Sequence, residues 1–472
     1  MDLLSNYEIS RTADFIRSRS FTRVALQFPD DLLRDSTKVA RALRSELGRR
    51  VRLFVMADTA YGSCCVDEVG AAHVDAECVI HYGHACMSPT TTLPAFFVFG
   101  KATIDVDDCV QSLHHCLSTN NRPILVLLGL EYLHALQDIK AAMSPRLQCT
   151  GSGLMVTYAE VTSTIINPSE DCDRRKGFFL GGLTWSIPTG HKMEEYLLFW
   201  IGDEDSAFAN MILTLNSCEI VRYDAKRSQL LKDFSHPKKI LRRRYYLVEK
   251  AKDANIVGIL VGTLGVAGFL DLIKQMKDLI EGTGKKSYTL IMGRPNSAKL
   301  ANFPECDVFV YVSCAQTALL DSKDFLAPVI TPYEAVLAFS RAKEWTGEYM
   351  LDFCGLDIPA FGSVNHTEEA RFSFIRGAYI EDVQPTGNGG QRIEETLALA
   401  ESTEKALSSS NQLTDSILFK GTARSGAEFF AARSFQGLSL QPENPSPPSL
   451  LIGRSGRAAG YADENQQGRY SS

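Results

Sequence analysis

One pattern occurs three times along this chain: an apolar run of strand length, a break at Gly or Pro, and a segment with helical periodicity. The apolar runs are 24–28, 123–129 and 256–262, and the helical segments that follow them are 32–47, 131–143 and 266–280. Apolar runs without strict alternation are typical of strands that helices cover on both faces. The pattern therefore predicts an α/β fold of three related α/β/α units with mainly parallel sheets.

The length of 472 residues agrees with about three domains, since a domain takes roughly 100–200 residues. The predicted units are 1–115, 116–235 and 236–380, followed by a helical extension over 381–437 (with a helix over 393–407) and a tail over 438–472. Further strands are predicted at 95–99, 154–160, 177–183, 211–215, 220–223, 288–292 and 308–312. The tail is rich in Pro, Gly, Ser and Gln, so we expect it to be disordered.

The net charge of −7 argues against a protein that binds nucleic acid or anionic membranes. The basic residues Lys238, Lys239 and 242–244 form a local cluster, which we expect to be a solvated helix face. No apolar run approaches the ~18–20 residues that span a bilayer, and the polar segment 1–8 is unlike a signal peptide. The twelve cysteines are scattered, so we expect a cytoplasmic protein with reduced thiols.

Residues 56–89 contain four cysteines and three histidines. Two predicted strands, 51–57 and 78–82, each lead into a glycine turn that carries cysteine: YGSCC at 61–65 and YGHAC at 82–86. A predicted helix over 66–74 connects them. Because the carboxyl ends of parallel strands meet at one edge of a sheet, we expect Cys65 and Cys86 to lie close together.

A third cysteine, Cys314, follows the predicted strand 308–312 and faces the same kind of edge. Three thiolates from separate loops suit an iron–sulfur cluster with one open iron; zinc competes, but its structural sites usually show C-x2-4-C pairs. Side chains of neighbouring residues in an extended chain point in opposite directions. We therefore expect only one of Cys64 and Cys65 to be a ligand, with Cys64 as the alternative to Cys65.

For the other polar and glycine-rich segments, a structural role is the expected one. His81 and His84 either donate to metal-bound sulfur or bond nearby backbone, which is the more frequent case. The glycine turn 262–268 lacks the dinucleotide-binding spacing and is expected to allow tight packing, and 294–296 is expected to be a surface turn. The remaining cysteines are expected to be buried apolar residues: Cys78, Cys109, Cys116, Cys149, Cys172, Cys218, Cys306 and Cys354.

Two long motifs resemble a known family. ADTAYGSCCVDEVGAAHVDAECVIHYGHAC at 57–86 and RPNSAKLANFPECDVFVYVSCAQTALLDSKDFLAPVITPYEA at 294–335 are similar to the first-domain and third-domain signatures of the diphthamide synthesis proteins. GSCCVDE is typical of the second, accessory subunit in eukaryotes, and the resemblance covers about 5–437. It implies three α/β domains around a central [4Fe-4S] cluster, with Cys65, Cys86 and Cys314 at the cluster-binding positions.

The resemblance also implies an activity and partners. The family's complex is a heterodimer with a related catalytic subunit, and a small iron protein donates electrons. The complex cleaves S-adenosylmethionine to a 3-amino-3-carboxypropyl radical and attaches this group to a histidine of translation elongation factor 2. This reaction is the first step of diphthamide biosynthesis.

One departure from the family pattern bears on the role of this chain. Catalytic subunits contribute one cysteine from each domain, but the middle turn here, GGLTWSIP at 181–188, has none, and Cys172 and Cys218 lie away from it. We therefore expect an accessory subunit with no catalytic residue of its own, whose cluster passes an electron to the partner's cluster or maintains it. The alternatives are a redox-silent scaffold with zinc-bound or vestigial cysteines and, on the glycine turn alone, a nucleotide-dependent enzyme.

Overall fold

The computed structural model describes residues 3–57, 59–120, 122–149, 155–161, 163–168, 177–232, 235–320, 325–340, 343–352, 356, 358, 371–375 and 377–380. The chain divides into two compact units, 1–438 and 439–472, and all described residues belong to the first. Among them, no helix is both long and apolar enough to cross a bilayer. The predictions for Cys172, Cys354, the extension 381–437 and the tail 438–472 lie outside the described residues.

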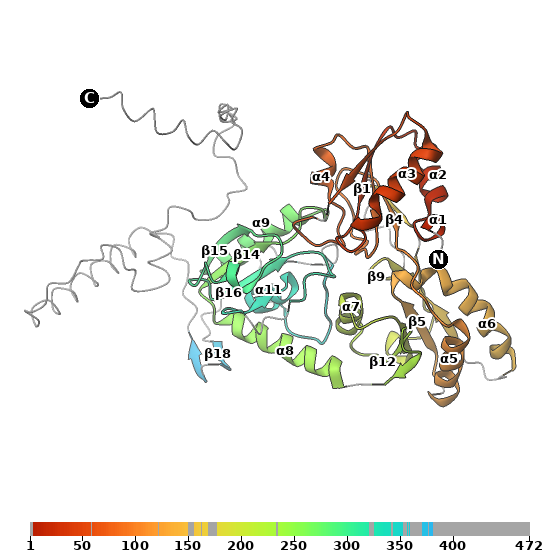
Figure 1. The fold of residues 1–472 in the computed structure, drawn as a ribbon. Coiled ribbons are helices and arrows are strands. Elements are labelled where there is room, and N and C mark those ends of the chain that lie inside the picture. The colour runs from red at the N-terminus through yellow and green to blue at the C-terminus, as the bar shows by residue number, and fades with distance from the viewer. Residues whose placement is uncertain are drawn as a thin grey trace, which may run out of the picture. The chain divides into compact units, whose positions relative to one another are not determined.

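The first sheet, of which Figure 1 labels β1 and β4, has the strand order β2-β1-β3-β4-β8 and is parallel except for β8. Its strands are β1 (Arg23–Gln27), β2 (Arg52–Met56), β3 (Cys78–Tyr82), β4 (Ala95–Val98) and β8 (Ile165–Ile166). The helical elements here are α1 (Leu3–Asn6), α2 (Ile9–Ser18), η1 (Leu33–Asp35), α3 (Ser36–Leu47) and α4 (Glu68–Ala72). Leu26 and Ile80 of the strands pack with Ile16 of α2 and Leu43 of α3, so these helices cover one face.

The second sheet has the order β13-β12-β11-β5-β6 and is parallel except for β13. Its strands are β5 (Ile124–Leu128), β6 (Val156–Tyr158), β11 (Leu197–Ile201), β12 (Glu219–Asp224) and β13 (Gln229–Leu231). A small antiparallel sheet adds β7 (Glu160–Val161), β9 (Phe178–Leu180) and β10 (Leu183–Trp185). The helical elements are α5 (Val106–Asn120), η2 (Leu130–Ala135), α6 (Leu136–Cys149), η4 (Met193–Glu195) and α7 (Ser206–Thr214). Leu125 and Leu198 share one core with Val79 and Phe97 of the first sheet.

The third sheet has the order β15-β14-β16-β17 and all its pairs are parallel. Its strands are β14 (Ile256–Val261), β15 (Lys286–Ile291), β16 (Val308–Val312) and β17 (Val329–Ile330). The helices are α8 (Ser235–Lys252), α9 (Phe269–Gly282), α10 (Ser297–Leu300) and α11 (Pro332–Phe339), and β18 (Arg371–Ser373) pairs with β19 (Ala378–Ile380). Ile259 and Val310 pack with Leu247, Ile273 and Val336 of α8, α9 and α11.

The three sheets share one topology. Numbered in chain order, the four parallel strands of each sheet lie in the order 2-1-3-4: β2-β1-β3-β4, β6-β5-β11-β12 and β15-β14-β16-β17. The structure thus confirms the predicted α/β fold with mainly parallel sheets. In this order, the connections leave the first and third strands toward opposite faces, which opens a crevice at the carboxyl edge.

One predicted strand of the middle part is wrong, and a second is correct only over 178–180. Residues 211–214 belong to helix α7, and Leu215 is its C-cap. The helix begins where the Asp205 carboxylate accepts a 2.9 Å hydrogen bond from the Phe208 amide. A short apolar run fits a buried helix as well as a strand, and the N-cap decides here. The predicted strand 177–183 is a hairpin of β9 and β10 instead. Gly181 and Gly182 make its turn, with φ of 56° and 90°, values that glycine adopts without strain.

The basic cluster on α8 is only partly the solvated face that its sequence predicts. Lys238, Lys239 and Arg242 are exposed, but Arg244 is buried. Its Nε donates a 2.6 Å hydrogen bond to Glu334 of α11, and Nη2 donates to the other oxygen of the same carboxylate. Helical periodicity turns this one side chain toward the core, where its charge is paired.

Candidate metal centre

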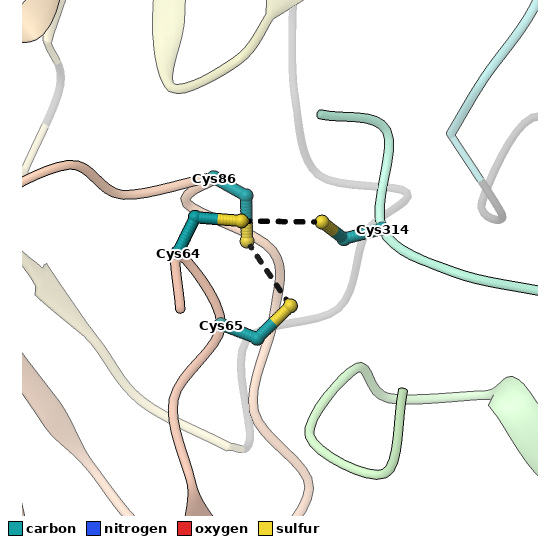
Figure 2. Close-up of side chains that lie close together, drawn as sticks. All are labelled: Cys64, Cys65, Cys86 and Cys314. Carbon is teal, nitrogen blue, oxygen red and sulfur yellow. Dashed lines mark hydrogen bonds between the residues drawn. The ribbon is translucent and has the colours of Figure 1, made fainter. Parts of the chain in front are cut away.

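Four cysteine sulfurs meet at one point (Figure 2). The Sγ atoms of Cys64, Cys65, Cys86 and Cys314 all lie within 4.8 Å of one another. The Cys64 and Cys314 sulfurs are 3.5 Å apart, and those of Cys86 and Cys65 are 3.8 Å apart. All four are buried free thiols that lie in the loops after β2, β3 and β16, at the carboxyl edges of two sheets.

The structure overturns the expectation that Cys64 and Cys65 point in opposite directions. Both sulfurs belong to the group, because the segment is a tight turn rather than an extended strand. The Cys65 amide donates a 3.0 Å hydrogen bond to the Gly62 carbonyl, which closes a four-residue turn. The Cys86 amide donates to the Cys64 carbonyl at 3.0 Å, so the two loops of the first sheet are joined beside the sulfurs.

A buried glutamine holds the Cys64–Cys65 loop. The side chain of Gln27, the last residue of β1, donates a 2.8 Å hydrogen bond to the Cys65 carbonyl and accepts one of 2.9 Å from the Asp67 amide. Both ends of the side-chain amide are thus used on a loop that has few partners in the sheet. The sequence analysis missed this residue, although a polar side chain that ends an apolar strand was a usable signal.

The glycine turn after β14 packs against the cysteine loops. A Cβ at Gly265 would lie 2.1 Å from the Val66 carbonyl oxygen, and one at Gly262 would lie 2.0 Å from the Tyr311 ring. The Ala267 amide also donates a 2.9 Å hydrogen bond to the Pro89 carbonyl. These contacts agree with the tight packing that the sequence analysis favours for this turn.

Two further residues of the third sheet reach the loops of the first. Arg294 Nε donates a 2.5 Å hydrogen bond to the Tyr61 carbonyl, just before the first cysteine pair. Gln316 Nε2 donates a 3.2 Å hydrogen bond to the Ala85 carbonyl, beside Cys86. The 294–296 turn is therefore more than a surface turn, since its arginine fixes the segment that leads to the sulfurs.

Hydroxyl groups surround two of the sulfurs. Thr317 Oγ1 lies 3.1 Å from the Cys314 sulfur, and Ser313 Oγ lies 2.5 Å from Thr317 Oγ1. Ser313 Oγ also donates a 3.5 Å hydrogen bond to the Gly262 carbonyl. When the Cys314 sulfur is ionised it has no proton, so Thr317 is the donor in their contact. Thr263 Oγ1 lies 3.8 Å from the Cys65 sulfur. The sequence analysis did not identify these hydroxyls.

The pKa values of three of the four thiols depart from the ordinary value, and not all in the same direction. Hydrogen bonds from Cys64, Cys65 and Cys86, in that order, and from Thr317 hold the pKa of Cys314 well below its ordinary value. The interaction with Cys314, with burial as a smaller cause, raises the pKa of Cys64 and of Cys65 well above the ordinary value. Cys314 therefore ionises more readily than Cys64 and Cys65, and a soft metal ion would displace the remaining protons on binding.

The turn from the middle part of the chain reaches the same region without a cysteine. A Cβ at Gly182 would lie 2.5 Å from Met87 Cγ, next to Cys86, and one at Gly181 would lie 3.8 Å from Gln316 Nε2. Glycine is required here by close approach as well as by φ. This part of the chain therefore contributes backbone rather than a thiol.

The histidines have partners of other kinds. His81 is buried, its Nε2 lies 3.1 Å from the Ser63 carbonyl, and its ring packs on Phe97 at 5.3 Å. His84 is exposed and lines a cavity of about 370 Å³ together with Glu131. Burial raises the pKa of the Glu131 carboxyl above its ordinary value.

The remaining described cysteines are buried, as the sequence analysis expects: Cys78, Cys109, Cys116, Cys218 and Cys306. The side chains of Cys149, Cys172 and Cys354 lie outside the described residues.

The donor set limits what this site can hold. Four buried thiols with no carboxylate among them select soft metals such as zinc, copper(I) or iron–sulfur clusters. A tetrahedral zinc ion with bonds near 2.3 Å separates its sulfurs by about 3.8 Å, so the observed spacing fits a single ion too. The residues present therefore fit an iron–sulfur cluster by chemistry, and they fit zinc as well.

Comparison with known proteins gives consistent matches. A family model described as a putative diphthamide synthesis protein matches residues 28–350. The chain is 36% identical to 2-(3-amino-3-carboxypropyl)histidine synthase subunit 2 of Danio rerio, over 99% of this chain and 93% of that protein. It is 37% identical to the protein of the same name from Xenopus laevis, over 98% of this chain and 93% of the other.

The fold also matches solved structures. Dph2 from Pyrococcus horikoshii, solved with a 4Fe-4S cluster, aligns with a TM-score of 0.55 at 19% identity, covering 73% of this chain and 94% of that one. At this identity the match supports the fold. A second structure of the same protein gives a TM-score of 0.54 over 75% of this chain and 96% of the other.

Proposed function

Because this chain belongs to the diphthamide synthesis protein family, we propose that it is the accessory iron–sulfur subunit of a 2-(3-amino-3-carboxypropyl)histidine synthase. The observation that carries this proposal is the buried group of four thiols at the carboxyl edges of two sheets. Cys65, Cys86 and Cys314 hold a [4Fe-4S] cluster in this proposal. Such a cluster supplies a single electron at low potential, which amino-acid side chains do not provide.

The proposed reaction belongs to the complex. It transfers a 3-amino-3-carboxypropyl group from S-adenosylmethionine to a histidine of translation elongation factor 2, in the cytoplasm, as the first step of diphthamide biosynthesis. The partners are a related catalytic subunit, which makes the heterodimer, and a small iron protein that donates electrons. The glycine turn at 181–182 supports the accessory role, because this part of the chain approaches Met87 and Gln316 beside the thiols with backbone and without a cysteine.

The chain's own residues have defined tasks in this proposal. Gln27 and Arg294 fix the two sides of the Cys64–Cys65 loop, and Gln316 fixes the Cys86 loop. The burial of the thiols excludes water from the centre. Thr317 donates a hydrogen bond to the Cys314 sulfur and so stabilises its negative charge.

Anaerobic purification of this chain with its catalytic partner tests the proposal. We expect a brown complex with bound iron and sulfide, and a loss of iron in Cys65→Ala, Cys86→Ala and Cys314→Ala. Cys306→Ala and Cys218→Ala are matched controls, since both residues are buried cysteines away from the group. An iron content that stays unchanged in all three site variants would contradict the proposal, as would turnover of S-adenosylmethionine by this chain alone.

The sulfur spacing favours one second candidate, a redox-silent scaffold that binds zinc and stabilises the catalytic subunit. The separations of 3.5 and 3.8 Å resemble those around one tetrahedral ion. A colourless protein with one equivalent of zinc and no sulfide, active in the complex, would support this candidate against the first.

A further inference from the structure

We infer that Cys64 is a metal ligand in addition to Cys65, Cys86 and Cys314, so that four cysteines of this chain close the centre. This inference rests on the proposed function. Cys64 is 3% exposed, and its sulfur lies 3.5 Å from the Cys314 sulfur. That separation is shorter than the 3.8 Å between the sulfurs of Cys86 and Cys65.

The surroundings of Cys64 are those of a ligand. A cysteine that only packs lies among apolar side chains, as Cys78 does between Val24, Leu26 and Ile80 in the core of the first sheet. The small buried cluster that contains Cys64 consists of the other three cysteines and Val266. Figure 2 shows its side chain turned toward Cys314.

The backbone explains how two adjacent cysteines reach one point. The turn from Gly62 to Cys65 replaces the alternating directions of an extended chain, and the Cys86 amide holds the Cys64 carbonyl at 3.0 Å. Gly62 leaves room for this approach, since a Cβ there would lie 3.0 Å from Thr317 Cγ2 and 3.6 Å from the Cys64 sulfur. The third-sheet loop and Cys64 therefore meet across a position without a side chain.

The chemical consequence concerns the free coordination position. A [4Fe-4S] cluster with three thiolates leaves one iron open to an exogenous ligand, whereas four thiolates occupy every iron. A closed centre can pass electrons but cannot bind S-adenosylmethionine at iron. The accessory role would then follow from the count of thiols in this chain.

Ligand access to the reconstituted full-length chain tests the inference. The chain is loaded anaerobically with iron and sulfide, reduced with dithionite, and its EPR spectrum is recorded before and after addition of cyanide and, separately, S-adenosylmethionine. We expect the wild-type spectrum to stay unchanged by either probe. We expect Cys64→Ala and Cys64→Ser to retain a cluster whose spectrum differs from wild type and shifts on addition of cyanide.

A wild-type EPR spectrum that shifts on addition of cyanide would overturn the inference. Cys64 variants whose spectra equal the wild-type spectrum, both without cyanide and with cyanide, would also overturn it. Cys78→Ala, a buried cysteine of β3, is the control for general damage to the fold. If the chain takes up zinc in place of iron and sulfide, the proposed function is wrong, but the inference that Cys64 is a ligand can still be tested. Cys64→Ala must then weaken zinc binding, and an unchanged zinc affinity would overturn the inference in that case too.

Discussion

The sulfurs of Cys64 and Cys314 lie 3.5 Å apart, although 250 positions separate the two residues in the chain. Cys64 follows the second strand of the first sheet, and Cys314 follows the third strand of the last. The contact therefore joins two sheets that otherwise have separate cores.

Oxidation of the metal-free chain should link these two cysteines. The pKa of Cys314 is held well below its ordinary value, so its thiolate adds to the oxidant, and the Cys64 thiol within contact distance then displaces the reduced oxidant to form the disulfide. We expect mild treatment with diamide to give a Cys64–Cys314 disulfide, detected by mass spectrometry of non-reduced peptides. Cys64→Ser should abolish this cross-link, and its absence from the oxidised wild-type protein would contradict the arrangement of the sulfurs.

Replacement of Thr317 by valine should lower the midpoint potential of the centre. The variant keeps the shape of the side chain but removes the hydroxyl 3.1 Å from the Cys314 sulfur. A hydrogen bond to sulfur stabilises the more negative, reduced state, so its loss moves the potential to more negative values. Thr317→Ser keeps the hydroxyl and should stay near wild type in an EPR-monitored redox titration. Equal potentials in all three proteins would remove Thr317 from this role.

The loss of the buried ion pair between Arg244 and Glu334 should lower the free energy of unfolding far more than the loss of an exposed ion pair. Glu334 also accepts a 2.9 Å hydrogen bond from the Tyr349 hydroxyl, so Arg244→Met leaves a buried carboxylate with one partner fewer. We expect a loss of about 3–5 kcal/mol in the free energy of unfolding, measured with urea. Lys277→Met, which breaks an exposed pair with Glu281, should cost at most about 0.5 kcal/mol. Similar losses of unfolding free energy in Arg244→Met and Lys277→Met would refute the conclusion that the Arg244–Glu334 pair is buried.

Glu131 should reduce stability as the pH rises. Burial raises the pKa of its carboxyl in the folded state, so the ionised form is disfavoured by folding. This penalty is absent below the unfolded pKa, near 4.3, grows as the pH rises to the folded pKa, and then stays constant. Glu131→Gln should therefore raise Tm more at pH 8 than at pH 4. Asp138→Asn, on the exposed side of α6, is the charge-matched control, and a Tm difference independent of pH would count against the burial argument.

Gly265→Ala should release metal from the centre. The added Cβ would lie 2.1 Å from the Val66 carbonyl oxygen, so the turn after β14 must move away from the Cys65 loop. Gly268→Ala is the matched control, because its φ of 84° strains an alanine by roughly 1 kcal/mol while the space around it is open. We expect metal loss in the first variant, and reduced stability with metal retained in the second. Full metal content in Gly265→Ala would show that the turn after β14 does not pack against the Cys65 loop at this position.

Sequence patterns predicted the parts of this molecule that depend on periodicity. The strands that precede Cys86 and Cys314 follow from apolar runs of fixed length, and parallel pairing then brings their carboxyl ends to one edge. The helix at 206–214 could not be separated from a strand by its apolar run alone, since both structures bury such a run. The N-cap Asp205 was the missing signal.

The details of the site depend on contacts that periodicity does not describe. The direction of Cys64 follows from a turn closed by one backbone hydrogen bond, and the alternation rule for extended chains therefore gave the wrong answer. Gln27 bonds the carbonyl of Cys65, 38 positions away, and Thr317 contacts the sulfur of Cys314, 3 positions away. Only the three-dimensional arrangement shows that both residues lie beside the cysteine group.

Because the thiols come from two loops of the first sheet and one of the last, whatever metal binds them also ties together distant stretches of the polypeptide. Part of the binding free energy then appears as conformational stability, and empty protein is the form that opens and is degraded. If the centre holds the proposed iron–sulfur cluster, a cell short of iron would lose the subunit itself, and the abundance of the subunit would fall with cofactor supply before any change in its synthesis.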